Sequence, residues 1–179
     1  MNLPNKITIF RMLMVPLFVV FMLVPKIPYG NYYAAAVFII AALSDLLDGY
    51  IARKNNLVTN FGKFMDPIAD KLLVCSALIC FVELKLLPAW VVIIIIAREF
   101  IISGFRLVAS DNGVVIAASY FAKLKTNVQM VMSILLIVNL DNYYINLLEQ
   151  ISIYLAVAFT VISMIEYIIK NRNVLKDKL

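Results

Sequence analysis

The chain has 179 residues, of which 64% are apolar and 15% are charged, and its mean hydropathy is +0.94. A soluble domain is about 45–50% apolar and about 25% charged, so this composition excludes an ordinary soluble domain, a disordered chain and a secreted disulfide scaffold. A net charge of +5 is too thinly spread for a nucleic-acid-binding protein, so no nucleic acid is expected as a partner. The sequence predicts an all-α, polytopic membrane protein with one membrane domain, residues 1–179.

Two residue types restrict the chemistry further. The chain has no histidine, which excludes an imidazole base, a histidine metal ligand and a Ser/His or Cys/His nucleophile pair. Its two cysteines, Cys75 and Cys80, lie in one apolar run and point in different directions on a helix. We predict that both are reduced packing residues.

Six apolar stretches are long enough to cross a bilayer, which takes about 20 residues. Lipid cannot satisfy backbone polar groups, so these stretches must be helices. In chain order they are expected at residues 7–24, 32–51, 67–84, 88–108, 121–140 and 151–169. Asp66 and Pro67 predict the N-cap and first residue of the third helix, and the turn residues 111–113 predict the end of the fourth.

Lysine and arginine are unevenly distributed between the two sides of these spans. Twelve fall on one side, whereas only Lys26 and Lys85 fall on the other. The positive-inside rule places both chain ends on the cytoplasmic side, and an even number of spans agrees with this. The sequence therefore predicts a multi-pass protein of the cell membrane whose termini are both cytoplasmic.

Four aspartates lie where the second and third predicted helices meet the cytoplasmic side. Asp45 and Asp48 share one helix face, and Asp66 and Asp70 share another. Four like charges in a poorly solvated place repel one another, so either several are protonated or cations are bound. Two divalent cations would balance the four charges, and ligation by oxygen alone suits Mg²⁺ or Mn²⁺.

Small and basic residues accompany the aspartates. Gly49, Ala52 and Gly62 leave room beside the backbone, and Arg53 offers a fork of donors suited to phosphate. Taken singly, Asp66 has a structural alternative as a helix cap and Arg53 as a positive flank of a span. Together, the residues indicate a site for a phosphate or pyrophosphate.

Residues 45–70 also fill every fixed position of the pattern D-x-x-D-G-x-x-A-R-x8-G-x3-D-x3-D. This segment resembles the signature of the CDP-alcohol phosphatidyltransferases. The resemblance implies six transmembrane helices around a polar cavity that opens to the cytoplasm, a homodimer, and CDP-diacylglycerol as the donor. It implies that two metal ions are held by Asp45, Asp48, Asp66 and Asp70. It further implies that Asp70 is the base acting on the attacking hydroxyl and that CMP leaves.

The resemblance also implies which residues contact the nucleotide. The positions that match within the signature are Gly49, Ala52, Arg53 and Gly62. Segments 5–11, 97–106 and 123–126 are similar to those of the bacterial phosphatidylglycerophosphate synthases, the branch whose acceptor is sn-glycerol 3-phosphate. This similarity adds Asn5 and Thr8 near the nucleotide.

Cations of the fourth and fifth spans indicate an anionic acceptor, with Arg98, Arg106, Lys123 and Lys125 as candidate contacts to its phosphate. A charge inside a span is costly and is usually functional. The alternative for the lysines is snorkelling at the interface. For Arg98 the alternative is an ion pair with Glu99, with Glu166 or with a residue of another helix. Glu99 is expected to face another way.

Two alternatives to transfer onto glycerol 3-phosphate stay open. One is the same reaction with another acceptor: serine, inositol phosphate or phosphatidylglycerol. The other is an ion-coupled or proton-coupled transporter that uses the aspartates as a relay. The sequence shows neither an inverted repeat nor a pair of broken helices, which argues against a transporter.

Overall fold

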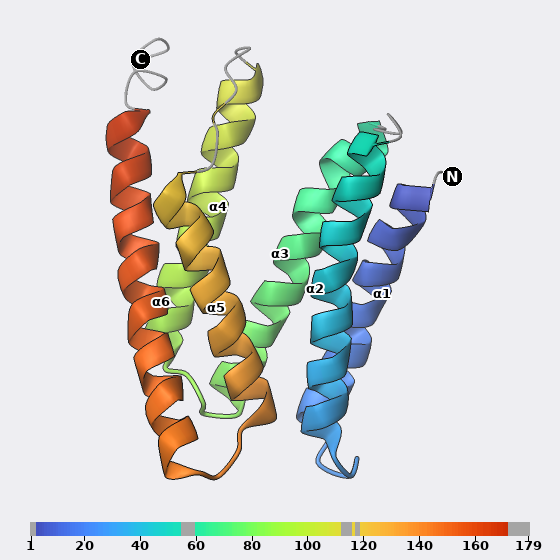
Figure 1. Cartoon of the computed structure of the whole chain (residues 1–179), viewed down its shortest axis with the longest axis vertical. Helices are drawn as coiled ribbons and strands as arrows, with labels where there is room; N and C mark the ends of the chain where they lie inside the picture. Colours follow the sequence, from blue (N-terminus) through green and yellow to red (C-terminus); the bar gives the residue numbers. More distant parts are fainter. Residues whose placement is uncertain (1–2, 55–59, 112–115, 117–118, 172–179) are drawn as a thin grey trace. The chain divides into compact units, whose positions relative to one another are not determined.

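The structure, a computed structural model, describes residues 3–54, 60–111, 116 and 119–171. Every regular element in these ranges is a helix, which confirms the predicted all-α class (Figure 1). The elements in chain order are α1 (Leu3–Leu23), α2 (Gly30–Lys54), α3 (Asn60–Glu83), α4 (Ala89–Asp111), α5 (Tyr120–Val138) and α6 (Tyr143–Lys170).

Three of the helices are long and apolar enough to cross a membrane by themselves. Within the described ranges these segments are Asn5–Leu23, Tyr120–Val138 and Tyr143–Lys170, and α2 adds a shorter apolar stretch, Gly30–Ser44. The apolar run of α4 is interrupted by the charged residues Arg98, Glu99 and Arg106. The prediction of six helices is confirmed, but length and composition support membrane spanning for three of them.

The predicted starts of α3 and α6, at residues 67 and 151, differ most from the structure. α3 begins at Asn60, so Asp66 and Pro67 lie inside it, and the prediction that Asp66 is the N-cap is wrong. α6 begins at Tyr143, where the Asn142 side chain accepts a hydrogen bond from the Tyr144 backbone N–H at 3.0 Å. An Asx cap of this kind satisfies a donor that a helix start leaves unpaired. The predicted end of α4 near Asp111 is confirmed.

Each of the three short turns contains one residue with positive φ. These are Tyr29 before α2, Lys85 before α4 and Asn139 before α6. Left-handed residues commonly terminate helices, and Lys85 and Asn139 follow the ends of α3 and α5 in this way, whereas Tyr29 directly precedes the start of α2. Cys75 and Cys80 lie within α3 and neither forms a disulfide, as predicted.

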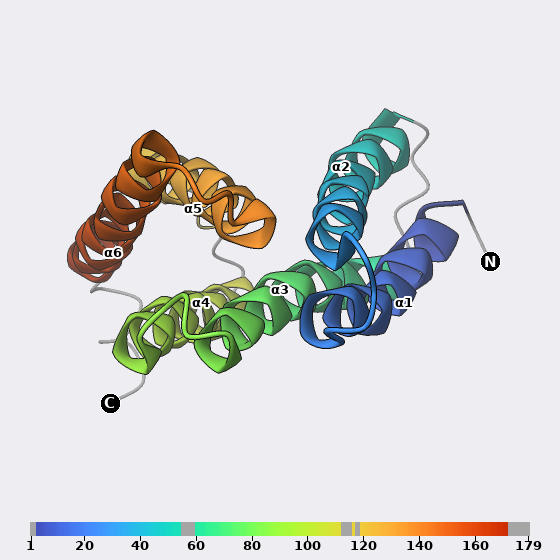
Figure 2. The same ribbon diagram turned by 90° about the horizontal axis from the view of Figure 1, so that it is seen from below.

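The helices fall into two compact units, which are described separately. The first unit comprises Met1–Leu87 with Leu136–Asn139. Within it, α1 packs against both α2 and α3 (Figure 2). The rings of Phe18 and Phe38 are fully buried between α1 and α2, with centroids 5.8 Å apart. The start of α1, the end of α2 and the start of α3 lie at the same end of this unit (Figure 1).

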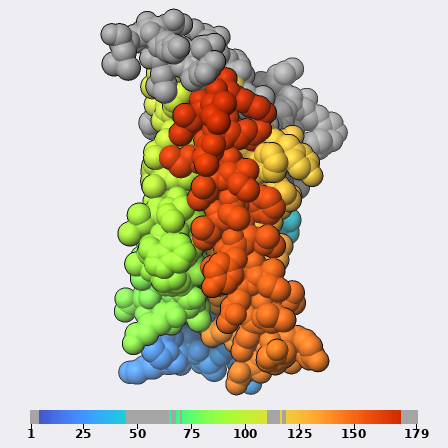
Figure 3. All heavy atoms as spheres, turned by 90° about the vertical axis from the view of Figure 1, so that its left-hand side faces the viewer, coloured from blue at the N-terminus to red at the C-terminus, as the bar shows by residue number. Residues whose placement is uncertain are grey.

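The second unit comprises Pro88–Leu135 with Leu140–Leu179. α6 lies along α4 (Figure 3). The buried face of α6 consists largely of small residues: Ser152, Ala156, Thr160 and Ser163. Small side chains allow the backbones of membrane helices to approach closely, and this face of α6 is therefore suited to tight packing.

Candidate functional site

The first group of predicted site residues lies at one end of the first unit. Asp45 and Asp48 are in the last turns of α2, and Asp66 and Asp70 are in the first turns of α3. Because α2 and α3 are antiparallel neighbours on α1, their backbones bring both halves of the aspartate motif to one end. The side chains of these four residues, and those at positions 49, 52, 53 and 62, lie outside the described part of the structure.

The start of α1 adds polar side chains at the same end. Asn5, Thr8 and Arg11 are spaced at three-residue intervals along a buried face, and Thr8 and Arg11 are each only 1% exposed. All three take part in polar or electrostatic interactions. Arg11 was missed as a site residue by sequence reasoning. The available signal was its spacing from Thr8, because a cation on a buried face requires a compensating partner.

The predicted metal ligands suit a hard divalent cation. Among side chains that the structure describes, no three acidic or cysteine residues gather into a possible metal site. The candidate donors predicted from the sequence are the four aspartates at the ends of α2 and α3, which offer only carboxylate oxygens. Oxygen ligation fits Mg²⁺ or Mn²⁺ better than Zn²⁺, which favours nitrogen and sulfur. The two-ion site stays a prediction.

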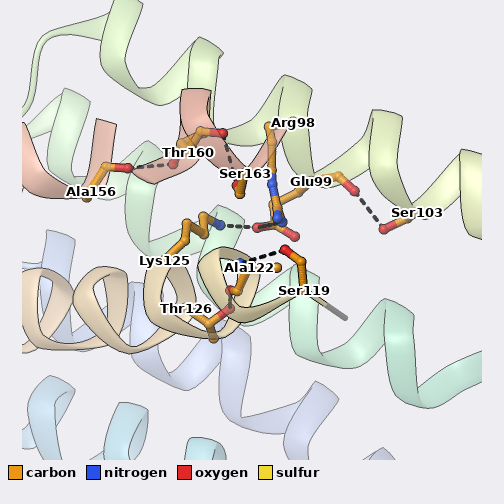
Figure 4. A network of polar contacts seen from close by, with 10 residues as sticks. All are labelled: Arg98, Glu99, Ser103, Ser119, Ala122, Lys125, Thr126, Ala156, Thr160 and Ser163. Carbon is orange, nitrogen blue, oxygen red and sulfur yellow. Dashed lines mark hydrogen bonds and ion pairs between the residues drawn. The ribbon is translucent and has the colours of Figure 1, made fainter. Parts of the chain in front are cut away.

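The second group lies in the second unit and centres on Glu99 of α4 (Figure 4). Its Oε1 atom accepts a hydrogen bond from Lys125 Nζ of α5, and Arg98 Nη1 lies 3.4 Å from the same oxygen. Arg98 and Lys125 are both buried, with exposed fractions of 5% and 1%. The expectation that Glu99 faces away from Arg98 is wrong, because the Arg98 guanidinium reaches the Glu99 carboxylate.

Arg106 extends this group, and Arg98, Arg106 and Lys125 are called the cationic cluster below. Arg106 lies near enough to Arg98 for their charges to interact. The Nε and Nη2 atoms of Arg98 and the Nε atom of Arg106 are buried, and no described residue accepts a hydrogen bond from them. Unpaired buried donors are costly, and a bound anion would satisfy them.

Tyr167 of α6 is a further member of this region that sequence reasoning missed. Its ring lies under the Arg106 guanidinium, and its hydroxyl is buried with no hydrogen-bond partner among the described residues. A tyrosine in an apolar run gives little signal by itself. The available signal was its place four residues after Ser163, on the buried face of α6.

The structure does not bring Lys123 into the cationic cluster. Lys123 is exposed, whereas Lys125 is buried on the other side of α5. Residues two apart on a helix point in roughly opposite directions. The candidate acceptor contacts that the structure brings together are thus Arg98, Arg106 and Lys125.

Comparisons with known proteins show the family to which the chain is similar. The model of the family described as CDP-alcohol phosphatidyltransferase matches residues 1–162. A Bacillus subtilis (strain 168) protein named CDP-diacylglycerol–glycerol-3-phosphate 3-phosphatidyltransferase is 47% identical, over 98% of this chain and 97% of its own. Relatives of the same name from Haemophilus influenzae and Wigglesworthia glossinidia brevipalpis are each 37% identical. They cover 99% and 93% of this chain, and 97% and 93% of their own.

Proposed function

Because the chain belongs to the CDP-alcohol phosphatidyltransferase family, we propose that it transfers a phosphatidyl group from CDP-diacylglycerol to sn-glycerol 3-phosphate. An acceptor hydroxyl oxygen bonds to the phosphorus that carries diacylglycerol, and the bond from that phosphorus to CMP breaks. The products are phosphatidylglycerophosphate and CMP. The acceptor is the one that the names of the full-length relatives give.

The structural observation that supports a phosphorylated acceptor is the cationic cluster. Arg98 and Lys125 are buried cations, and the spare donors of Arg98 and Arg106 have no protein partner among the described residues. A phosphate monoester supplies both the negative charge and the acceptor oxygens that this region lacks. Serine is a zwitterion and would leave most of the positive charge uncompensated.

The end of the first unit that carries the four aspartates binds the donor, CDP-diacylglycerol. Members of the family generally use divalent metal ions, and the residues that would hold two Mg²⁺ or Mn²⁺ ions are Asp45, Asp48, Asp66 and Asp70. When bound, such ions neutralise charge on the pyrophosphate and on the leaving group. Asp70 also accepts the proton of the attacking hydroxyl.

The remaining residues of that end hold the nucleotide. Asn5 and Thr8 are buried on α1 and contact the CDP moiety. Gly49, Ala52 and Gly62 leave space for its approach beside the backbone, and the Arg53 fork binds phosphate oxygens. Positioning and electrostatic stabilisation account for most of the catalysis in phosphoryl transfer.

The chain is a membrane protein with several apolar helices. Its termini and active site face the cytoplasm, as the excess of positive charge on one side supports, and the enzyme works as a homodimer surrounded by membrane lipids. Crosslinking in native membranes and access of a membrane-impermeant reagent to engineered terminal cysteines would test these two statements.

Release of CMP by the purified protein tests the reaction. With CDP-diacylglycerol in mixed micelles, we expect CMP only when glycerol 3-phosphate and a divalent metal are both present. Serine, inositol phosphate and phosphatidylglycerol serve as competing acceptors in parallel reactions. Faster release with any of these would overturn the acceptor, and no release with any acceptor would overturn the reaction class.

A further inference from the structure

Glu99 brings a negative charge into the middle of the cationic cluster, and we propose that it is a positioning residue for the acceptor. In this role it aims the Lys125 ammonium and matches the charge of the cluster to that of a phosphate monoester dianion. The inference rests on the proposed function, because it assigns the cluster to the phosphate of the acceptor. Glu99 itself does not touch the reacting atoms.

The first argument is the sharing of one carboxylate oxygen. Lys125 Nζ from α5 and Arg98 Nη1 from α4 both contact Glu99 Oε1 (Figure 4). A lysine ammonium sits on a flexible four-carbon stem and is not oriented by its own geometry. Because the shared oxygen attracts both cations, it holds them close together in spite of their mutual repulsion.

The second argument is the edge of Arg98 that Glu99 leaves uncovered. Glu99 contacts Nη1, whereas Nε and Nη2 are buried without a partner among the described residues. Nε and Nη2 form one side of the guanidinium plane, and two parallel N–H groups on such an edge can bind two oxygens of one phosphate. The contact with Glu99 therefore fixes the guanidinium while its fork stays available.

The third argument is the balance of charge. Among the described residues, the cluster has three cations, and the Glu99 carboxylate reduces their summed charge to two positive units. A phosphate monoester carries about −1.5 to −2 at neutral pH, which balances the site, whereas a diester carries one negative charge. By contrast, the ion pair of Lys170 with Glu166 on α6, at 2.6 Å, is neutral as a unit.

Steady-state kinetics on Glu99→Gln, Lys125→Met and the double variant test the inference. At saturating CDP-diacylglycerol, Glu99→Gln should raise the KM for glycerol 3-phosphate about tenfold, which is the loss expected for one charge-assisted contact. The KM for the donor and the kcat should change by less than the acceptor KM. In the Lys125→Met background, Glu99→Gln should have a smaller effect than in the wild type, because the part of its effect that acts through Lys125 is already lost.

Two more variants complete the design. Glu99→Asp keeps the charge on a shorter side chain and should give an intermediate acceptor KM. Glu166→Gln removes a carboxylate that is also paired with a lysine in this unit, and it should leave both KM values unchanged. The rise in Tm caused by adding glycerol 3-phosphate gives a second measurement, which should shrink in Glu99→Gln and persist in Glu166→Gln.

Several outcomes would overturn the inference. An unchanged or lowered acceptor KM in Glu99→Gln would do so, as would effects of the two substitutions that simply multiply in the double variant. If Glu99→Gln does not fold, a wild-type acceptor KM in Glu99→Asp has the same meaning. The proposed function fails separately, through absence of acceptor-dependent CMP release by the wild-type protein, and the inference then falls with it.

Discussion

The guanidinium carbon of Arg106 lies 6.0 Å from the centroid of the Tyr167 ring, so the cation of α4 rests over an aromatic face of α6. The Phe105 ring meets the same tyrosine edge-on, with centroids 5.5 Å apart. A ring face attracts a cation without using its N–H groups. Tyr167 therefore holds Arg106 in place and leaves its donors available for an anion.

Substitutions of Tyr167 should separate the roles of its ring and its hydroxyl. The Tyr167 hydroxyl has no partner among the described residues, and we expect it to donate a hydrogen bond to the acceptor phosphate. Tyr167→Phe keeps the ring and should then raise the acceptor KM about two- to tenfold, the range for loss of one neutral hydrogen bond. Tyr167→Leu also removes the cation–π contact and should raise it further. Tyr154→Phe, at an exposed position of α6, is the matched control. Equal acceptor KM values for all three variants and the wild type would exclude Tyr167 from the acceptor site.

Lys123 and Lys125 should differ sharply although they are two residues apart. Lys125 is buried beside Glu99 and Lys123 is exposed. Lys125→Met should raise the KM for glycerol 3-phosphate by about 10- to 150-fold, which corresponds to a charge-assisted contact of about 1.5–3 kcal/mol. Lys123→Met should change it less than threefold or so. The reverse order in acceptor titrations would show that the cluster is misassigned.

Removal of divalent metal should abolish activity. Excess chelator should stop CMP release, and Mg²⁺ or Mn²⁺ should restore it, because four clustered carboxylates need a counter-charge. Asp45→Asn, Asp48→Asn and Asp66→Asn should each remove most of the activity. Asp141→Asn, in the exposed turn before α6, is the matched control. Full turnover in excess chelator would contradict the metal site.

Gly30→Ala should destabilise the first unit. A Cβ atom at Gly30 would lie 2.6 Å from the backbone carbonyl oxygen of Phe21, so the turn between α1 and α2 would have to shift. Overpacking of this kind costs about 1–3 kcal/mol. At Gly104 a Cβ atom would meet nothing within 4 Å, and Gly104→Ala should preserve or raise stability. Thermal unfolding in detergent should give a lower Tm for Gly30→Ala only.

Much of the architecture follows from the sequence because apolar run length is a strong signal in a membrane protein. The number and order of the helices and the end of α4 near Asp111 were predictable in this way. The start of α3 was not. The Asp66-Pro67 pair is a local cap signal, but residues 60–65 continue the same helix and bring it along α1.

The placement of both halves of the aspartate motif at one end of the first unit was predictable, because the spacing of the motif is fixed within two consecutive helices. The arrangement around Glu99 was not, because helical periodicity separates the Cβ atoms of neighbouring residues but does not limit the reach of long side chains. Arg98 and Glu99 are adjacent in sequence, yet they meet through their terminal atoms. Lys125 joins them from another helix, and such a tertiary contact leaves no local pattern.

The hydroxyl groups on the buried face of α6 are bonded within their own helix. Ser152 donates to the Glu149 carbonyl, Thr160 to the Ala156 carbonyl and Ser163 to the Thr160 carbonyl. These hydroxyls therefore need no partner on α4, and helices in lipid associate through close van der Waals contact. Natural variation along this face should then exchange side chains of similar size, such as serine and alanine, whether or not they carry a hydroxyl, and should exclude large side chains.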